Sequence, residues 1–375
     1  MKDRLEIKNA HRIVVKVGTS TLTHSTGRLN IHQIELLVRQ LSDLVNQGKE
    51  ILLVTSGAVG AGLDRMKLKE KPEAIPEKQA LAAIGQGILM HIYEKLFSEY
   101  GQTVAQVLLT KENSLHYSQY INSRNALLAL LQMNVIPIIN ENDVVTVEQL
   151  KFGDNDTLSA MVASIVDADA LILLTDIDGL YNKNPQTCPD AKLLERVTEI
   201  TPEIEAIAGG AGTKMGTGGM FTKIQAAKIA MSSGVNMVIA NGSSNNILND
   251  ILAGENYGTI FPAREAHLKQ RKSWLAFGKS ICGSITVDKG CEDALVKNGS
   301  SILAAGITDY AGEFAAGNTV RVLTADDREI ARGIINYDTA SLTKILGHNT
   351  RDFTSLLSGK IYNEVIHRDN MVLMV

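Results

Sequence analysis

The sequence is poor in cysteine and aromatic residues, and neither sign of charge is in large excess. Its 375 residues include three cysteines, Cys188, Cys282 and Cys291, and none of their spacings is the Cys-x-x-Cys of zinc or redox sites. Three cysteines cannot form a disulfide framework, so we expect a reducing compartment, the cytoplasm. The net charge is −4, from 37 basic and 41 acidic residues, so no overall positive field exists to hold nucleic acid or an anionic membrane.

Long apolar runs are also lacking. The first run, residues 13–15, ends at Lys16 and is too short for a signal-peptide core or a membrane span. Hydrophobic residues still make up 45 % of the chain and charged residues 21 %, as in ordinary globular proteins. At about 150 residues per domain, the length predicts two or three domains. We therefore expect a folded, soluble protein without a membrane partner.

Short apolar runs alternate with longer segments of helical spacing through the first two thirds of the chain. The apolar runs are 13–17, 51–55, 104–109, 135–139, 170–174 and 235–240, and the helical segments are 31–46, 77–97, 118–132, 156–166 and 222–232. Runs that are apolar on both faces predict an α/β fold, a mainly parallel sheet flanked by helices. Ligands of such sheets bind beyond the carboxyl ends of the strands, so the residues after each run are the candidates for a site.

The pattern changes after about residue 280. Short β-branched segments, 284–287, 319–323 and 329–335, are separated by glycine turns and predict a small β-rich barrel or sandwich. The residues before them are basic with helical character, for which a solvated surface is the simpler interpretation. We expect one domain over 1–262, a linker over 263–280 and a second domain over 281–375.

Two segments that follow early strands are candidates for anion binding. Lys16 interrupts an apolar strand, and a buried ammonium group has to be paired or functional. An edge-strand lysine that extends its ammonium group to solvent is the alternative. Residues 54–62, VTSGAVGAG, leave backbone N–H groups uncovered where a helix begins, so an anion can approach closely. A tight structural turn would have the same composition.

Two later segments combine small residues with charge. Residues 140–157, NENDVVTVEQLKFGDNDT, group acidic and amide side chains around a short connection, which suits a substrate with an ammonium group. Helix caps explain part of this cluster, with Asp154 or Asn155 capping a helix near Asp156. Residues 209–223, GGAGTKMGTGGMFTK, place a glycine-rich backbone before Lys223, where we expect a helix to begin. This combination can neutralise a polyphosphate, although a flexible linker is the alternative.

Common nucleotide-binding fingerprints are missing. The chain has no G-x-G-x-x-G, and its one G-K-S, residues 278–280, has Ser273 where a Walker A loop requires glycine. A dinucleotide-dependent dehydrogenase and a P-loop kinase are both disfavoured.

Six segments in this order resemble the amino acid kinase superfamily and, within it, the glutamate 5-kinases: IVVKVGTS, TSGAVGAG, IINENDVV, FGDNDTLSA, LLTDIDGLY and TGGMFTKIQAAKIA. The resemblance runs from about residue 10 to 260. The segments ITVDKGCEDAL, SSILAAGI, GEFAAGNTVRV and EIARGIINY are similar to a PUA domain, a small β module that follows the kinase domain in many bacterial members. Single lysine and glycine segments are shared with carbamate, aspartate and acetylglutamate kinases. Phe221 stands where the family often has serine, and Cys291 where alanine is usual.

The resemblance implies ATP-dependent phosphorylation of the side-chain carboxylate of L-glutamate, which yields L-glutamyl 5-phosphate and ADP and begins L-proline biosynthesis. It further implies Mg²⁺ with the nucleotide, a homo-oligomer (dimer or tetramer) and feedback inhibition by proline.

The resemblance also implies roles for individual residues. By position, Lys16 and Lys223 would contact the phosphates, and Asp156 would orient both lysines. Ser56, Asp143 and Asn155 would bind glutamate, and Thr175 and Asp176 would contact adenosine. The loop around the phosphates would comprise Thr217, Gly218, Gly219, Met220, Phe221, Thr222 and Lys223.

Two other functions remain open. Another carboxylate or carbamate kinase of the superfamily would share most of these segments. An RNA-binding protein is the second alternative, because PUA domains elsewhere contact RNA. Residues 281–375 contain nine basic and twelve acidic residues, and an acidic module is a poor phosphate-binding surface, so we do not expect a nucleic-acid partner.

Overall fold

The computed structural model describes residues 2–24, 26–68, 70–110, 117–146, 155–185, 187–209, 219–263, 281–357 and 362–374. The chain divides into two compact units, residues 1–265 and 266–375. The expected linker, residues 263–280, lies outside the described residues except for Ala263. The boundaries of the two domains therefore stay a prediction.

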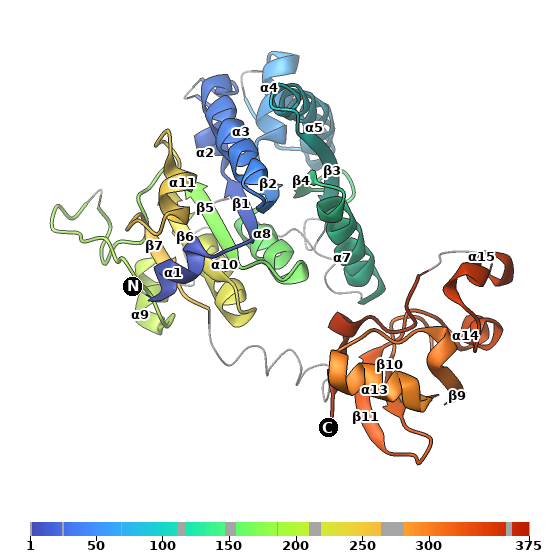
Figure 1. The fold of residues 1–375 in the computed structure, drawn as a ribbon. Coiled ribbons are helices and arrows are strands. Elements are labelled where there is room, and N and C mark those ends of the chain that lie inside the picture. The colour runs from blue at the N-terminus through green and yellow to red at the C-terminus, as the bar shows by residue number, and fades with distance from the viewer. Residues whose placement is uncertain are drawn as a thin grey trace. The chain divides into compact units, whose positions relative to one another are not determined.

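A seven-stranded sheet forms the centre of the first unit (Figure 1). Its strands are β1 (Arg12–Val17), β2 (Glu50–Val54), β3 (Thr103–Leu109), β4 (Val135–Glu141), β5 (Ala170–Thr175), β6 (Asn236–Asn241) and β7 (Thr259–Phe261). The strand order is β3-β4-β2-β1-β5-β6-β7, and all neighbours are parallel except β7, which runs antiparallel to β6. The six predicted runs all form strands, and the mainly parallel sheet is confirmed. The three residues of β7 are too few to give a periodic signal.

Helices cover both faces of this sheet. On one face the apolar core includes residues of α7 (Tyr117–Gln132), α8 (Asn155–Ile165) and α10 (Met220–Ser232). On the other face it includes residues of α1 (Lys2–Lys8), α2 (Thr19–Leu22), α3 (Ile31–Asn46), α5 (Ile75–Ser98) and α11 (Ile247–Leu252). Two further helices, α4 (Ala58–Met66) and α9 (Pro202–Ile207), complete this unit among the described residues.

Alternation along β1 decides which layer each of its side chains faces. Ile13, Val15 and Val17 pack with the α3 and α5 layer, whereas Val14 packs with the α8 and α10 layer. Because side chains alternate along a strand, Lys16 faces the same layer as Val14. The ammonium group of Lys16 is therefore directed toward the N-terminal turns of α8 and α10.

The helix starts follow from local residues. Asn30 caps α3, since its side chain accepts a hydrogen bond from the N–H of Gln33. Helix α10 begins at Met220, three residues before the predicted start at Lys223, because the extended backbone of Gly219 already serves as its N-cap. Lys223 consequently lies in the first turns of α10. Helix α8 begins at Asn155, and the other predicted cap, Asp154, lies outside the described residues.

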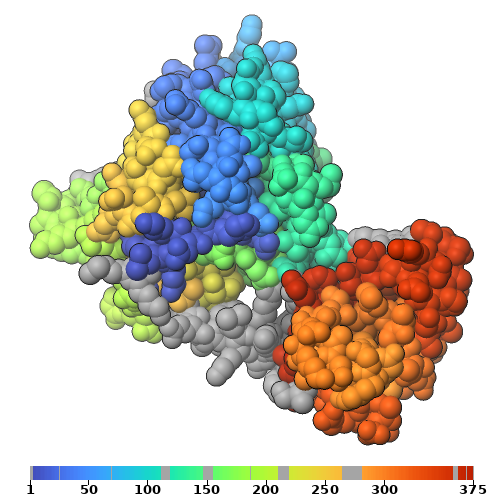
Figure 2. Space-filling view, viewed as in Figure 1, coloured from blue at the N-terminus to red at the C-terminus, as the bar shows by residue number. Residues whose placement is uncertain are grey.

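The second unit has its own sheet and its own core. Its strands are β8 (Ile281–Val287), β9 (Ile307–Ala311), β10 (Thr319–Leu323), β11 (Glu329–Ile334) and β12 (Met371–Leu373), in the order β12-β11-β10-β8-β9. The helices α13 (Lys289–Asn298), α14 (Thr339–Ile345) and α15 (Phe353–Leu356) pack with it around buried residues such as Ile285 and Val320. Figure 2 shows the side chains of this unit, orange to red, packed into one body. The β-rich expectation for this part is confirmed.

Candidate active site

Two lysines and one aspartate form a buried ion cluster beyond the end of β1. Lys16 Nζ lies 2.5 Å from Asp156 Oδ1, and Lys223 Nζ lies 3.2 Å from Asp156 Oδ2. Both lysines are 4 % exposed and Asp156 is fully buried. The three side chains together carry one net positive charge in a region screened from water, where electrostatic interactions are strong. The cluster is therefore suited to hold an anion.

The surroundings of Asp156 reinforce this arrangement. The hydroxyl of Thr222 has two acceptors for its one proton, Asp156 Oδ2 at 2.9 Å and the Gly219 carbonyl at 2.7 Å. Asp156 lies in the first turn of α8, and Lys223 and Thr222 lie near the start of α10, so two helix N-termini with their partial positive charge converge here. The alternative interpretation of Lys16 is wrong, because β1 is a central strand between β2 and β5.

A cluster of amide and hydroxyl groups adjoins the ion cluster. Asn155 Nδ2 donates toward three oxygens: the carbonyl of Thr55 at 2.6 Å, Ser56 Oγ at 2.9 Å and Asn140 Oδ1 at 2.9 Å. Thr55 and Ser56 follow β2, and Asn140 lies near the end of β4, the strand next to β2. An amide group has only two N–H bonds for these three acceptors. One of the three interactions is therefore replaceable, and the Ser56 hydroxyl can donate elsewhere.

Two backbone groups fix the orientation of these amides. The Thr55 carbonyl can only accept a hydrogen bond, so Asn155 must direct its nitrogen toward it. The N–H of Glu141 can only donate, and it donates to Asn140 Oδ1 at 2.9 Å. Asn155 Oδ1 is consequently turned away from the Thr55 carbonyl and, among the described residues, receives no hydrogen bond. This oxygen is an acceptor for a donor such as an ammonium group.

The remaining predicted site residues lie at the same edge of the sheet. Asp143 is half-buried in the turn after β4. Thr175 is the buried last residue of β5, and its hydroxyl donates to Asp176 Oδ1 at 3.1 Å. Asp176 is exposed. Gly219 caps α10, and Met220, Phe221 and Thr222 form its first turn, whereas Thr217 and Gly218 lie outside the described residues.

Sequence reasoning missed two polar residues that support this edge. Tyr93 is fully buried in α5, and its hydroxyl lies 2.8 Å from Thr55 Oγ1. Gln86, two helical turns earlier, accepts a hydrogen bond from Asn140. Burial raises the pKa of the Tyr93 phenol, so it stays neutral at physiological pH. The available signal was the two-turn spacing of Gln86 and Tyr93, which places two polar groups on one face of an otherwise largely apolar helix.

Two negative findings concern metals and membranes. Within the described residues, no group of three or more His, Cys, Asp and Glu side chains could hold a metal ion. Both oxygens of Asp156 already contact lysines. In the same part of the chain, no helix is both long enough and apolar enough to cross a membrane.

Comparisons with known proteins identify the family of this chain. The amino acid kinase family matches residues 11–241, and the PUA domain matches residues 283–357. A glutamate 5-kinase of Caldanaerobacter subterraneus subsp. tengcongensis is 54 % identical over 363 residues, covering 97 % of this chain and 98 % of the relative. A glutamate 5-kinase of Moorella thermoacetica is 53 % identical over 371 residues, covering 99 % and 98 %. Among solved structures, a UMP kinase from Bacillus anthracis matches with a TM-score of 0.48 and 15 % identity, over 68 % of this chain and 96 % of that one. The chain therefore belongs to the amino acid kinase family and, within it, to the glutamate 5-kinases, with a PUA domain in its C-terminal part.

Proposed function

We propose that this protein transfers the γ-phosphoryl group of ATP to the side-chain carboxylate of L-glutamate and releases L-glutamyl 5-phosphate and ADP. One observation carries the proposal. Consecutive residues of α8, Asn155 and Asp156, belong to the amide cluster and to the buried ion cluster respectively. A group that recognises an ammonium donor is thus held one residue from a site for phosphate oxygens.

The reaction needs no general base. The acceptor carboxylate has a pKa of about 4.3 and is already ionised at neutral pH. Its oxygen forms a bond to the γ-phosphorus while the bond from that phosphorus to the bridging oxygen breaks, and ADP leaves with the electron pair. The physical difficulty is to bring two anions together in line, and positioned cations solve it.

Lys16 and Lys223 are the cations that act on the transferring group. Asp156 holds their ammonium groups near one another in spite of their mutual repulsion, which makes it a positioning residue. We propose that Mg²⁺ would bind together with ATP, on the phosphate oxygens, and would partly neutralise their charge. Among the described residues, no group of three or more His, Cys, Asp and Glu side chains is present that could hold it.

Glutamate would be recognised by both of its α-groups. Asn155 Oδ1 and Asp143 would accept hydrogen bonds from the ammonium group, and the replaceable hydroxyl of Ser56 would donate to the α-carboxylate. Acetylglutamate lacks the ammonium group, and carbamate lacks the carbon chain. The site therefore favours glutamate over acetylglutamate and carbamate.

The nucleotide would lie over the ends of β5 and α10. Thr175 and Asp176 would contact adenosine, and residues 217–223 would enclose the phosphates, with the N-terminus of α10 directed at them. The kinase domain would comprise residues 1–262 and the PUA domain residues 281–375, joined by 263–280.

We also propose that proline inhibits the enzyme. Proline carries the same charged α-groups as glutamate, so it would compete for Ser56, Asp143 and Asn155 as a feedback inhibitor. The enzyme would act in the cytoplasm as a dimer or tetramer, at the first step of L-proline biosynthesis. RNA binding is the weaker alternative, because the C-terminal 95 residues carry more acidic than basic side chains.

The decisive experiment measures ADP release with glutamate, aspartate, acetylglutamate and carbamate, each with and without proline. We expect kcat/KM for glutamate to exceed the others by at least about a hundredfold, and proline to raise the KM for glutamate. Faster turnover of another acceptor would overturn the glutamate assignment. Tight, salt-sensitive RNA binding in a gel-shift assay would instead favour the RNA-binding alternative.

A further inference from the structure

We propose that Gln86 of α5 is a positioning residue for glutamate binding, which acts by fixing the amide orientation of Asn140 and, through it, that of Asn155. This inference rests on the proposed function. Gln86 lies in the helix layer opposite α8, and neither the sequence segments nor the resemblance singled it out. It reaches the site through one intervening side chain.

Three carboxamides form a continuous chain across the end of the sheet. Gln86 Oε1 accepts a hydrogen bond from Asn140 Nδ2 at 2.9 Å, and Asn140 Oδ1 accepts one from Asn155 Nδ2 at 2.9 Å. Gln86 is 8 % exposed and Asn140 is 4 % exposed, so water cannot readily replace these partners. The orientation of each amide therefore depends on its neighbour.

The direction of each hydrogen bond between these three carboxamides is determined. Asn140 Oδ1 receives the Glu141 N–H as well as Asn155 Nδ2, so Asn140 must direct its own nitrogen toward Gln86. If Gln86 offered no acceptor, Asn140 would have a buried, unsatisfied N–H group, which is energetically unfavourable. Rotating its amide to escape that cost would set its nitrogen against Asn155 Nδ2, donor against donor. Asn155 would then keep only the Thr55 carbonyl and the Ser56 hydroxyl as partners of its nitrogen, and the direction in which it presents Oδ1 to the substrate would be less tightly held.

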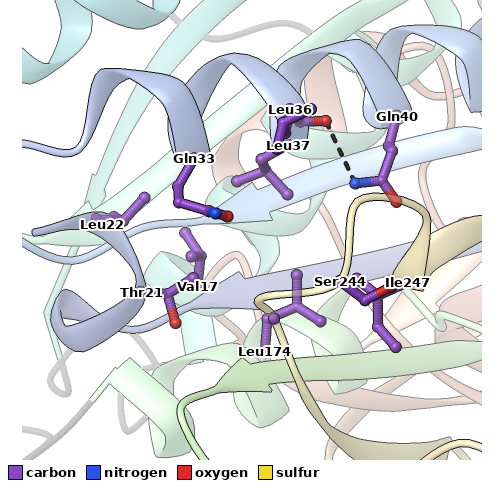
Figure 3. A pocket seen from close by; sticks show the side chains of 11 residues that line it. Val17, Thr21, Leu22, Gln33, Leu36, Leu37, Gln40, Leu174, Ser244 and Ile247 are labelled. Atoms are coloured by element: carbon purple, nitrogen blue, oxygen red, sulfur yellow. Dashed lines mark hydrogen bonds between the residues drawn. The ribbon is translucent and has the colours of Figure 1, made fainter.

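A second observation separates Gln86 from an ordinary buried glutamine. Gln86 Nε2 is buried and has no hydrogen-bond partner. Gln40 of α3, which is 7 % exposed, uses both ends of its amide. Its Nε2 donates to the Leu36 carbonyl at 3.3 Å (Figure 3), and its Oε1 accepts from the Leu248 N–H at 3.0 Å. Gln86 thus has an unsatisfied donor, whereas its acceptor oxygen is used by Asn140. The acceptor atom, directed at Asn140, is the part of this side chain that the site requires.

Helix α5 packs closely against α4. A Cβ atom on Gly85 would lie 1.7 Å from the Ala58 carbonyl oxygen, and one on Gly62 would lie 2.1 Å from the Leu81 carbonyl oxygen, so α4 and α5 are in close backbone contact. Tyr93 of the same helix contacts Thr55, whose carbonyl accepts from Asn155. Two of the three acceptors of Asn155 are thereby supported from α5.

The test compares three variants in the full-length enzyme. Gln86→Met removes the amide at similar length and should raise the KM for glutamate about tenfold, while the KM for ATP changes less than about twofold. Gln86→Glu restores an acceptor toward Asn140 and should return the KM for glutamate to within about threefold of that of the unaltered enzyme. Gln40→Met is the matched control, because it removes an equally buried amide of α3, in the same helix layer as α5, whose hydrogen bonds go to Leu36 and Leu248. It should leave both KM values unchanged.

Each variant is first checked by thermal unfolding, and Gln86→Leu replaces Gln86→Met if the latter does not fold. The inference is overturned if Gln86→Met keeps the glutamate KM of the unaltered enzyme, if Gln40→Met raises that KM equally, or if Gln86→Glu fails to restore it. The unaltered enzyme is measured in parallel. Absence of glutamate turnover there would count against the proposed function, whereas a variant-specific result bears on Gln86 alone.

Discussion

Asn155 and Asp156 are consecutive residues at the start of α8, yet their side chains join different clusters. Asn155 donates to oxygens at the ends of β2 and β4, and Asp156 pairs with lysines from β1 and α10. One helix terminus therefore sets the distance between the substrate-recognition groups and the phosphate-binding cations. In a reaction that depends on alignment, small displacements of this terminus are expected to lower the rate.

The charge of Asp156 should matter for folding as well as for activity. Asp156→Ala leaves two ammonium groups buried without their common counter-ion, so we expect the free energy of unfolding to fall by about 3–5 kcal/mol. Urea denaturation followed by circular dichroism measures it. Asp190→Ala is the control, because Asp190 and its partner Lys183 are exposed and such pairs contribute at most about 1 kcal/mol. Equal losses in the two variants would contradict a stabilising role of the buried cluster.

Removing either lysine should separate catalysis from folding. Lys16→Ala and Lys223→Ala each leave a neutral Lys–Asp pair, so we expect both variants to remain folded. Each loses a preorganised cation worth about 3–4 kcal/mol in the barrier, and kcat should fall at least about a hundredfold. Steady-state ADP release measures this, with Lys183→Ala as the exposed-lysine control. A variant with nearly unaltered kcat would exclude that lysine from the reaction.

Asp143 should act on glutamate binding alone. Its half-buried carboxylate follows β4, close in sequence to Asn140 of the amide cluster. Asp143→Ala should raise the KM for glutamate by more than about tenfold, because a charge-assisted contact with the ammonium group is lost. The KM for ATP should change much less, and initial rates over a grid of both concentrations separate the two. Similar increases in both constants would show that Asp143 does not bind the ammonium group.

The strands and the main helices were predictable because their signals are local. Residues 31–46 have a helical spacing that ends in a turn, and α3 has those bounds. Lys16 stood out because a charge in an apolar strand needs an explanation, and the structure supplies Asp156 as its partner. The resemblance added the pairing of both lysines with Asp156, which no local pattern could indicate.

The support behind the site could not be predicted in the same way. Asn155 contacts Thr55 across 100 residues of sequence, and Asn140 contacts Gln86 across 54. These contacts depend on strand order and on how closely α4 and α5 pack. The two-turn spacing of Gln86 and Tyr93 puts both on one face of α5, but spacing alone does not show which strand residues that face meets. Gln86 and Tyr93 therefore emerged only from the assembled structure.

The close contact of α4 and α5 makes a prediction about stability. Gly85→Ala would place a Cβ atom 1.7 Å from the Ala58 carbonyl oxygen, so the helices must separate, at a cost of about 1–3 kcal/mol or more. Gly87 lies in the same helix with no heavy atom within 4 Å of a Cβ, so Gly87→Ala should stabilise by about 0.5–1 kcal/mol through helix propensity. Thermal unfolding of the two variants should shift in opposite directions. A stabilised Gly85→Ala variant would contradict the close packing.

Cys291 offers a test in the second unit. Burial, and then the nearby charge of Asp288, raise the pKa of its thiol to about 11 from 9.0. Its Sγ packs against Gly306, where an added Cβ would lie 3.1 Å away. Because the folded state favours the protonated thiol, the stability this group contributes is complete below pH 9 and is lost as the pH rises through 11.

The thiolate is the reactive form, so Cys291 should be alkylated by iodoacetamide far more slowly in the folded protein at pH 8 than in urea. Its rate in the folded protein should rise steeply between pH 9 and 11. Peptide mass spectrometry follows each cysteine separately, with half-buried Cys188 as the internal comparison. Folded and unfolded protein reacting at the same rate at Cys291 would show that its thiol is not shielded, and the packing of α13 against Gly306 would then have to be looser than the structure shows.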